Sequence, residues 1–509
     1  MSCFLGIDLG TSGLKSVLID EKGKVLASAT VEYPLYQPQN GWAEQDADDW
    51  IEAAKTSIHT VLSDAGLSAD AVTCVGLTGQ MHGLVLLDDR DRPIRRAILW
   101  CDGRSSAECD EMTVRAGGRD KLIEYCANPA IAGFTASKAL WVRNNELENW
   151  QKAKKMLLPK DYLRLRMTGE YASDASDASG MQLYDVTHRR WSDELLKAFE
   201  IDRGMLPDVY ESPEVCGRVT ASAADEFGLQ AGTPVVAGAG DNAASAVGMG
   251  AVREGEAFVS IGSSGVVYAH SSLPALDPLG RAHTFCSAVP GEWHMMGVTQ
   301  GAGLSLKWFK DTLCGGLVEK AKAAGKSVYA MLDELAAASP IGSNRLIFLP
   351  YLMGERTPHL DPLARGAFVG LSASHTLGDM ARAVMEGVAF SLADCLGVLG
   401  EAGVKPKSLV AVGGGGTSAL WREIVCNAMN TEVELSPTAA EGAAYGAALL
   451  AAVGGGAFSS VNDACSALTV RTPACSPNGE RAARYSEVYG IYRALYPTMQ
   501  KSMHSLAKI

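Results

Sequence analysis

Two aspartates, Asp8 and Asp241, each follow an apolar, strand-like run and stand beside glycine-rich turns. A carboxylate beside a phosphate-binding turn repels the phosphates unless a cation lies between them. Because Mg²⁺ prefers oxygen ligands and gives up its water reluctantly, Asp8 is predicted to hold Mg²⁺ through water. Asp241 then serves as a general base that takes a hydroxyl proton during phosphoryl transfer.

The turn after Asp8 reads Gly10-Thr11-Ser12-Gly13. Its glycines let a ligand approach the backbone closely, and its amides and hydroxyls suit phosphate oxygens. Lys15 would add positive charge nearby. An ordinary hairpin with an Asx-type turn explains the same residues, and N-capping of a helix explains Asp241.

Residues 257–270 repeat this strand-turn-strand pattern with Gly262, Ser263 and Ser264 in the turn. Two related domains, each opening with such a hairpin, would account for the repeat. The second turn would then close on the phosphates from the other domain.

A run of four glycines, 413–416, follows an apolar stretch and precedes a helical pattern. Gly414 and Gly415 would let the backbone approach a flat ring or a phosphate at a helix start. Taken alone, the run favours a flexible loop. The chain contains neither the GxxxxGK[ST] loop nor the spaced GxGxxG pattern of other nucleotide sites.

Strand-like runs alternate with helical patterns along the 509 residues, of which 46–66 is the clearest helix. The sequence therefore predicts an α/β protein of two domains, 1–245 and 246–509. Residues 442–458 are predicted to form a tightly packed helix of small residues. The last helical stretch, 481–503, is expected to pack back onto the first domain.

Composition narrows the classes of partner. The net charge of −13 argues against a nucleic-acid surface and against a polybasic membrane contact. The 12 cysteines are scattered without metal-binding or disulfide spacing, and no secretory signal opens the chain. We therefore expect a cytoplasmic protein with reduced thiols.

These segments, taken in order, resemble the phosphate-one, phosphate-two and adenosine motifs of the actin-like ATPase superfamily. Residues 133–145 and 366–387 resemble the two signatures of the FGGY carbohydrate kinase family. The resemblance implies two actin-like (ribonuclease H-like) domains, each a mixed β-sheet flanked by helices, with a cleft between them. It also implies ATP and Mg²⁺ as cofactors, a small sugar as substrate and a possible homodimer.

GQMHG at 79–83, ILWCDGR at 98–104, residues 157–180 and GERTPH at 354–359 resemble the branch of that family that phosphorylates D-xylulose. In that branch Asp241 would deprotonate the C5 hydroxyl of the sugar. The sugar would be bound by Met81, His82, Trp100, Asp241 and Asn242. The phosphates would be approached by Thr11, Ser12, Ser263 and Gly303, and the adenosine by Gly414 and Gly415.

Departures from the pattern keep alternatives open. Cys101 stands where a polar residue, often asparagine, is usual, which puts the preference among ketoses in doubt. Another ketose, a pentitol or gluconate is an alternative acceptor, and a non-catalytic sugar or nucleotide sensor is an alternative from another class. Other acidic residues are interpreted as structural: Glu386 as a support of the domain interface or hinge, Glu355 with Arg356 as a loop ion pair, and Asp174 with Asp177 as a solvated turn.

Overall fold

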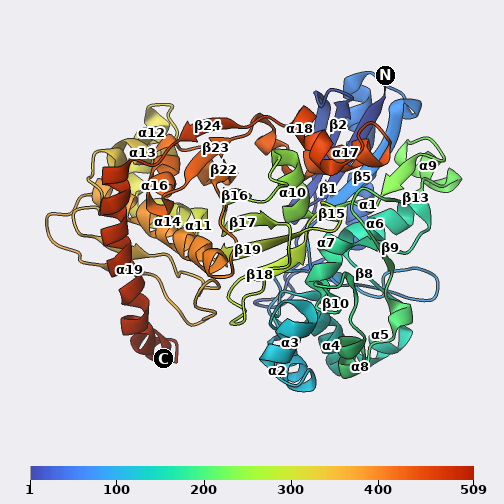
Figure 1. Cartoon of the computed structure of the whole chain (residues 1–509), viewed down its shortest axis with the longest axis horizontal. Helices are drawn as coiled ribbons and strands as arrows, with labels where there is room; N and C mark the ends of the chain where they lie inside the picture. Colours follow the sequence, from blue (N-terminus) through green and yellow to red (C-terminus); the bar gives the residue numbers. More distant parts are fainter. Residues whose placement is uncertain (1, 509) are drawn as a thin grey trace.

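The computed structural model describes residues 2–508 and consists of two lobes, each built around a seven-stranded mixed β-sheet (Figure 1). The first sheet has the order β13-β14-β5-β1-β2-β3, with β15 also paired to β5. Its strands are β1 (Cys3–Leu9), β2 (Gly13–Asp20), β3 (Val25–Glu32), β5 (Val72–Gly79), β13 (Val215–Arg218), β14 (Pro234–Val236) and β15 (Ala239–Gly240).

The second sheet repeats this order as β24-β23-β22-β16-β17-β19, with β18 added at its edge. In both sheets the first hairpin strand pairs antiparallel with the second and parallel with an inner strand, β5 or β22. The predicted repeat of two related α/β domains is therefore confirmed. The strands of the second sheet are β16 (Glu256–Ile261), β17 (Gly265–Ser271), β18 (His283–Cys286), β19 (Trp293–Thr299), β22 (Ser408–Val412), β23 (Glu432–Leu435) and β24 (Thr472–Cys475).

Short strand pairs lie outside the two sheets. They are β4 (Glu44–Gln45) with β7 (Ala97–Ile98), β6 (Val85–Leu87) with β8 (Lys155–Leu157), β9 (Ala172–Asp174) with β12 (Asp208–Tyr210), β10 (Tyr184–Asp185) with β11 (Arg190–Trp191), and β20 (Ile347–Leu349) with β21 (Ala367–Val369).

Helices flank the sheets in both lobes (Figure 1). Those before residue 250 are α1 (Ala47–Ala65), α2 (Ser106–Arg115), α3 (Arg119–Cys126), α4 (Thr135–Asn145), α5 (Leu147–Lys152), α6 (Pro159–Thr168), α7 (Ala175–Ala178), α8 (Asp193–Phe199), α9 (Ala221–Phe227) and α10 (Asp241–Met249). Those after it are α11 (Gly303–Leu313), α12 (Gly315–Ala323), α13 (Val328–Ala337), α14 (Leu377–Glu401), α15 (Gly413–Gly416), α16 (Ala419–Met429), α17 (Gly442–Gly454), α18 (Val461–Leu468) and α19 (Gly479–Leu506).

The helix predicted over 46–66 forms as α1, and its ends follow from local chemistry. Asp46 caps it by accepting the amide of Asp48 at 3.1 Å, and Gly66 ends it in the left-handed conformation. Trp50 and Ile58 lie on its buried face and pack into the core of the first sheet. Helical spacing of apolar residues thus sets both the helix and the side that it buries.

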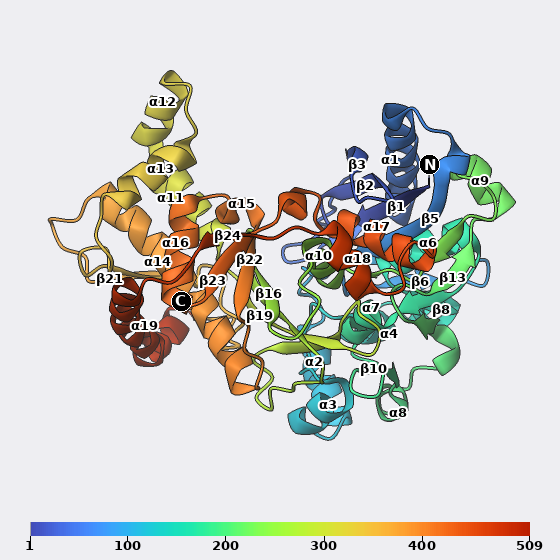
Figure 2. The ribbon, with the colours of Figure 1, turned by 45° about the horizontal axis from the view of Figure 1, so that its top comes forward.

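Helix α10 lies between the lobes and contributes to both hydrophobic cores (Figure 2). Ala244 and Val247 pack with residues of the first sheet and of α17, whereas Ala246 and Met249 pack against the second sheet. The domain boundary at 245/246 falls inside this shared helix and stays a prediction.

Helix α17, from the C-terminal part of the chain, packs on the first sheet and confirms the predicted helix of small residues. A Cβ on Gly6 of β1 would lie 2.0 Å from the carbonyl oxygen of Ala444, and one on Gly446 would lie 1.8 Å from that of Ala244. Backbones approach this closely only where a side chain is missing. The small residues therefore join α10, α17 and the first sheet.

The last helix does not pack on the first domain, so that expectation is wrong. Helix α19 runs along the outer edge of the second lobe, where Tyr485, Tyr492, Tyr496 and Met503 enter its core (Figure 1). This buried tyrosine face holds the helix there, and α17 with α18 makes the return to the first lobe instead. Helix α14 is long and apolar enough to cross a membrane, but most of it is buried in the second lobe.

We predict that Gly446→Ala strongly destabilises the protein because its new methyl group would overlap the backbone of α10. Overpacking of this kind costs about 1–3 kcal/mol or more. Gly490→Ala is the matched control, since Gly490 lies in α19 with open space around it, and alanine there gains up to about 1 kcal/mol. Thermal unfolding measures both changes. Equal melting temperatures in the two variants would contradict this account of the α10–α17 contact.

Candidate active site

Asp8 lies near the end of β1, opposite Lys15 of β2 and beside Thr78 of β5. Its Oδ1 is shielded from solvent and has no hydrogen-bond partner among residues 2–508. Burial, and then the charge of Asp241, raise the pKa of Asp8 to about 7. An unsatisfied carboxylate oxygen beside a second acid suits a bound cation. The described residues contain no group of three or more acidic, histidine or cysteine side chains that could hold a metal alone.

The turn after Asp8 is held by a polar network that sequence reasoning missed. The Thr11 hydroxyl donates to Gln80 Oε1 at 3.3 Å and accepts from Trp100 Nε1 at 2.9 Å. Gln45 Nε2 donates to the Thr11 carbonyl at 2.7 Å, and Gln80 Nε2 donates to Gln45 Oε1 at 2.8 Å. The Thr11 side chain therefore orients Trp100, while the neighbouring Ser12 is exposed.

Lys15 reaches across to the segment before α17. Its Nζ lies 2.7 Å from Glu441 Oε2 and donates to the Ala440 carbonyl at 2.9 Å. Its charge is thus already paired, so the predicted contribution of Lys15 at the phosphates competes with this ion pair.

Asp241 is the first residue of α10, and Gly240 is its N-cap, so the N-capping interpretation of Asp241 is wrong. Its Oδ1 accepts the backbone amide of Asn242 at 2.7 Å and Asn242 Nδ2 at 2.9 Å. Burial raises the pKa of Asp241 to about 6, although both Asn242 donors oppose the rise. A carboxylate with a pKa this close to neutrality is suited to accept a proton.

Met81 and His82 lie next to this acid. A Cβ on Gly240 would meet the Met81 side chain at 3.0 Å, and His82 has a left-handed backbone with φ of 70°. The His82 ring stacks on Phe134 with centroids 4.1 Å apart, and its Nδ1 lies 3.1 Å from the Gly180 carbonyl oxygen. Burial, together with the charge of Lys138, holds the pKa of His82 well below its usual value. The ring is therefore neutral and keeps Nε2 for a ligand.

Trp100 and Cys101 are exposed at the edge of this region, Trp100 to 40%. The next residue, Asp102, is buried and accepts the Ala43 amide at 2.6 Å and Arg104 Nη2 at 2.7 Å. The ILWCDGR segment thus has a fixed buried end and an open end at Cys101.

The second hairpin and the glycine run meet in the other lobe. Gly303, at the start of α11, donates its amide to the Gly262 carbonyl at 2.6 Å, and Ala302 donates its amide to the Ser263 carbonyl at 3.1 Å. Residues 413–416 form the short helix α15 rather than a flexible loop. A cavity of about 560 Å³ opens between these segments. Its lining includes Gly262, Ser263, Gly303, Gly414 and Gly415, with Lys307, Tyr329 and Asp333 that sequence reasoning missed.

Asp174 and Asp177 are fully buried, so the interpretation as a solvated turn is wrong. Lys160 Nζ lies 2.7 Å from Asp161, 2.8 Å from Asp174 and 3.1 Å from Asp177. Arg164 Nη1 also lies 2.9 Å from Asp161. Burial and the neighbouring carboxylates raise the pKa of Asp177 well above its usual value. With Asp177 neutral, two cations balance two carboxylates.

Ser176 connects this buried cluster to Gly240 of β15. Ser176 Oγ donates to Asp174 Oδ2 at 2.5 Å and accepts the amide of Gly240 at 3.0 Å. Gly240 directly precedes Asp241, so the cluster supports the backbone on which the acid is mounted. Lys160 and Asp161 are neighbours in α6, but Asp174 and Asp177 lie in β9 and α7, so the cluster could not be inferred from one segment of the sequence.

Two other acidic residues are bonded within the second lobe. Glu386 pairs with Arg382 at 2.8 Å and accepts from Ser343 Oγ at 2.9 Å, so it supports that lobe's interior rather than the domain interface. Glu355 accepts Thr299 Oγ1 at 2.6 Å and the backbone amide of Arg356 at 2.7 Å. It forms no ion pair with the Arg356 guanidinium, so that expectation is wrong.

Comparisons with known proteins agree with this architecture. Residues 3–248 match the description "FGGY family of carbohydrate kinases, N-terminal domain", and residues 257–455 match the C-terminal domain. The chain is 39% identical to a xylulose kinase of Lactococcus lactis subsp. lactis (strain IL1403), over 100% of this chain and 99% of that protein. It is 40% identical to a xylulose kinase of Escherichia coli (strain K12), over 97% and 98%. The crystal structure of a "xyloylose kinase" from Brucella ovis has a TM-score of 0.89 at 39% identity and covers 98% of this chain and 99% of that one.

We predict that Asp177→Asn changes stability little, whereas Asp174→Asn is strongly destabilising. Asparagine resembles a neutral Asp177, but loss of the Asp174 charge leaves Lys160 underpaired, at a cost of about 3–5 kcal/mol. Chemical denaturation measures both.

The pH dependence gives a second measurement. Because the pKa of Asp177 is raised by folding, the folded state retains a proton that the unfolded state releases above pH about 4. Stability therefore falls as pH rises above that value, and Asp177→Asn should remove this contribution. Equal destabilisation by the two substitutions would contradict the assigned proton.

Proposed function

This chain belongs to the FGGY family of carbohydrate kinases, and we propose that it transfers the terminal phosphoryl group of ATP to the C5 hydroxyl of D-xylulose. The substrate assignment rests on the identity of about 40% to xylulose kinases over nearly the full length of the chain. The partly buried acid pair and the neutral His82 beside it are compatible with that reaction.

Asp241 is the proposed general base. Its pKa of about 6 leaves the carboxylate ionised at neutral pH yet basic enough to share the proton of an attacking hydroxyl. The two nitrogen donors of Asn242 hold one carboxylate oxygen, which leaves the other for the substrate.

Asp8 is the proposed partner of Mg²⁺, through water. Its unpartnered Oδ1 fits a cation, and the lack of a larger ligand cluster among residues 2–508 fits an ion held chiefly by water and phosphate oxygens. Bound there, Mg²⁺ would neutralise charge on the ATP phosphates.

The nucleotide is proposed to lie across the two hairpins. Gly10, Thr11 and Ser12 would approach the phosphates from one lobe, and Gly262, Ser263, Ser264 and Gly303 from the other. Adenosine would enter the cavity beside Gly414 and Gly415. Closure of the lobes would exclude water, so that the sugar is the acceptor.

The sugar is proposed to lie against Met81 and His82, with Asn242 and Trp100 completing its site. Neutral His82 Nε2 suits a hydroxyl, and the Trp100 ring is oriented by Thr11. A homodimer is proposed from the family resemblance, and a cytoplasmic location from the scattered cysteines without disulfide spacing.

Acceptor preference tests the substrate assignment. Purified protein with Mg-ATP should give its highest kcat/KM with D-xylulose among a panel that includes ribulose, gluconate and pentitols. Coupled ADP formation measures the rates. A D-xylulose value far below that of another acceptor would overturn the assignment.

We predict that Asp241→Asn lowers sugar-dependent ADP formation about 10²- to 10⁴-fold, because the general base is lost. ATP binding should survive, since Asp241 does not line the nucleotide cavity. Asp89→Asn, on the exposed surface, is the control and should retain full activity. Unchanged turnover in Asp241→Asn would remove this residue from the mechanism.

A further inference from the structure

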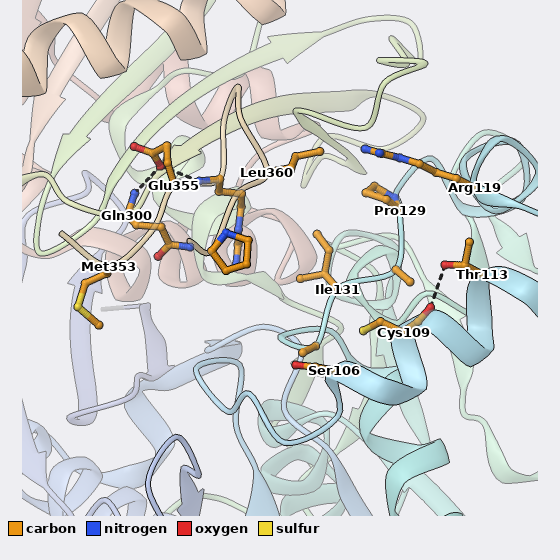
Figure 3. Close-up of a pocket in the computed structure, with 14 residues that line it drawn as sticks. Ser106, Cys109, Thr113, Arg119, Pro129, Ile131, Gln300, Met353, Glu355 and Leu360 are labelled. Carbon is orange, nitrogen blue, oxygen red and sulfur yellow. Dashed lines mark hydrogen bonds between the residues drawn. The ribbon is translucent and has the colours of Figure 1, made fainter. Parts of the chain in front are cut away.

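A second cavity, of about 480 Å³, lies between the two lobes. Figure 3 shows Ser106, Cys109 and Ile131 of the first lobe on one side, and Gln300, Met353 and Leu360 of the second on the other. Arg356 also lines it. The Arg356 guanidinium makes no hydrogen bond or ion pair with any residue between 2 and 508, although burial lowers its pKa. The charge of the neighbouring Glu355 opposes that lowering, but a half-buried cation with no hydrogen-bond partner among the described residues is suited to a ligand.

The loop that carries Arg356 is firmly anchored on both sides. Glu355 and Asp361 exchange backbone hydrogen bonds of 2.9 and 2.8 Å. Thr357 donates its amide to the Val298 carbonyl at 2.9 Å and its hydroxyl to the Arg281 carbonyl at 2.6 Å. Glu355, which also lines the cavity, accepts the backbone amide of Gln300 at 3.0 Å (Figure 3). Arg356 is thus mounted on a fixed backbone, which lowers the entropic cost of binding.

This cavity adjoins the proposed sugar site. Ile131 lines it and also packs against the cluster that contains Met81 and Phe134. The positive charge of Arg356 contributes to the lowered pKa of His82, so the guanidinium lies within electrostatic reach of that ring. The Met81 side chain lies next to Gly240, the residue before Asp241, whereas Arg356 lies on a loop of the other lobe. A sugar extended from Asp241 along Met81 and His82 would therefore end near Arg356.

The chemistry of a 2-ketopentose determines which group lies at the end of the sugar near Arg356. When the C5 oxygen closes onto C2, the C5 hydroxyl is used up in the ring and cannot be phosphorylated. Only the open chain offers a C5 hydroxyl, and it then carries a free C2 carbonyl at the other end. A carbonyl oxygen accepts hydrogen bonds only, and a guanidinium donates only, through a planar fork.

We propose that Arg356 is a substrate-binding residue that donates hydrogen bonds to the C2 carbonyl of the open-chain ketose and so selects the form whose C5 hydroxyl is free. This inference rests on the proposed function, since it identifies how the same site distinguishes a ketose from the corresponding alditol.

The test compares D-xylulose with xylitol, in which C2 carries a hydroxyl. Arg356→Met should lower kcat/KM for D-xylulose about 100-fold, as expected for a lost charge-assisted hydrogen bond. The inhibition constant of xylitol against D-xylulose should change less than about 5-fold in the same variant. Arg356→Lys keeps the charge but loses the planar fork, so its kcat/KM for D-xylulose should lie between those of the wild type and of Arg356→Met.

Arg119→Met is the matched control, because Arg119 lines the same cavity but donates to the Leu279 carbonyl. Arg119→Met should leave kcat/KM for D-xylulose and the inhibition constant of xylitol within about 3-fold of the wild-type values. The ATP affinity and the melting temperature of each variant show whether it folds. If Arg356→Met does not fold, the comparison of D-xylulose with xylitol in Arg356→Lys tests the proposal alone. An unchanged kcat/KM, or equal weakening of D-xylulose and xylitol, would overturn the assignment of Arg356.

Turnover by the wild-type protein distinguishes failure of this proposal from failure of the proposed function. If D-xylulose is a poor acceptor, the function fails, and the Arg356 variants are then tested with the best ketose of the panel and its C2 alditol. A selective loss for that ketose would support the role of Arg356, and an equal loss would overturn it.

Discussion

Two acidic side chains that are partly buried at one place cannot both keep their charge without compensation, and this constraint organises the molecule around Asp8 and Asp241. Burial raises the pKa of both groups, and the charge of Asp241 raises that of Asp8 further. Asn242 partly stabilises Asp241, but Asp8 Oδ1 has no donor among the described residues. The asymmetry favours a base at Asp241 and a cation beside Asp8.

The position of this pair depends on close backbone packing. Asp8 is on β1, Asp241 begins α10, and α17 packs against both elements through Gly6 and Gly446. Because α10 also contributes to the core of the second lobe, the acid is mounted on the element shared by the two lobes. The buried Lys160 cluster supports the same acid from behind through Ser176 and Gly240.

Local patterns in the sequence were sufficient for much of the fold. The repeated glycine-hydroxyl turns predicted two hairpins, and the spacing of Trp50 and Ile58 predicted α1. The contacts that sequence reasoning missed join residues of different elements. Lys15 of β2 meets Glu441 before α17, and Lys160 of α6 meets Asp174 of β9 and Asp177 of α7, so none of these contacts can be inferred from one segment alone. The tyrosines of α19 likewise gave no indication of which lobe would bury them.

The most direct test of the account is a crystal structure with D-xylulose and a non-hydrolysable ATP analogue bound with Mg²⁺. It should place the C5 hydroxyl of the open-chain sugar within about 2.6–3.2 Å of Asp241, with the phosphates between the turns at 10–13 and 262–265. A C5 hydroxyl directed away from Asp241, or phosphates bound outside the two turns, would contradict it.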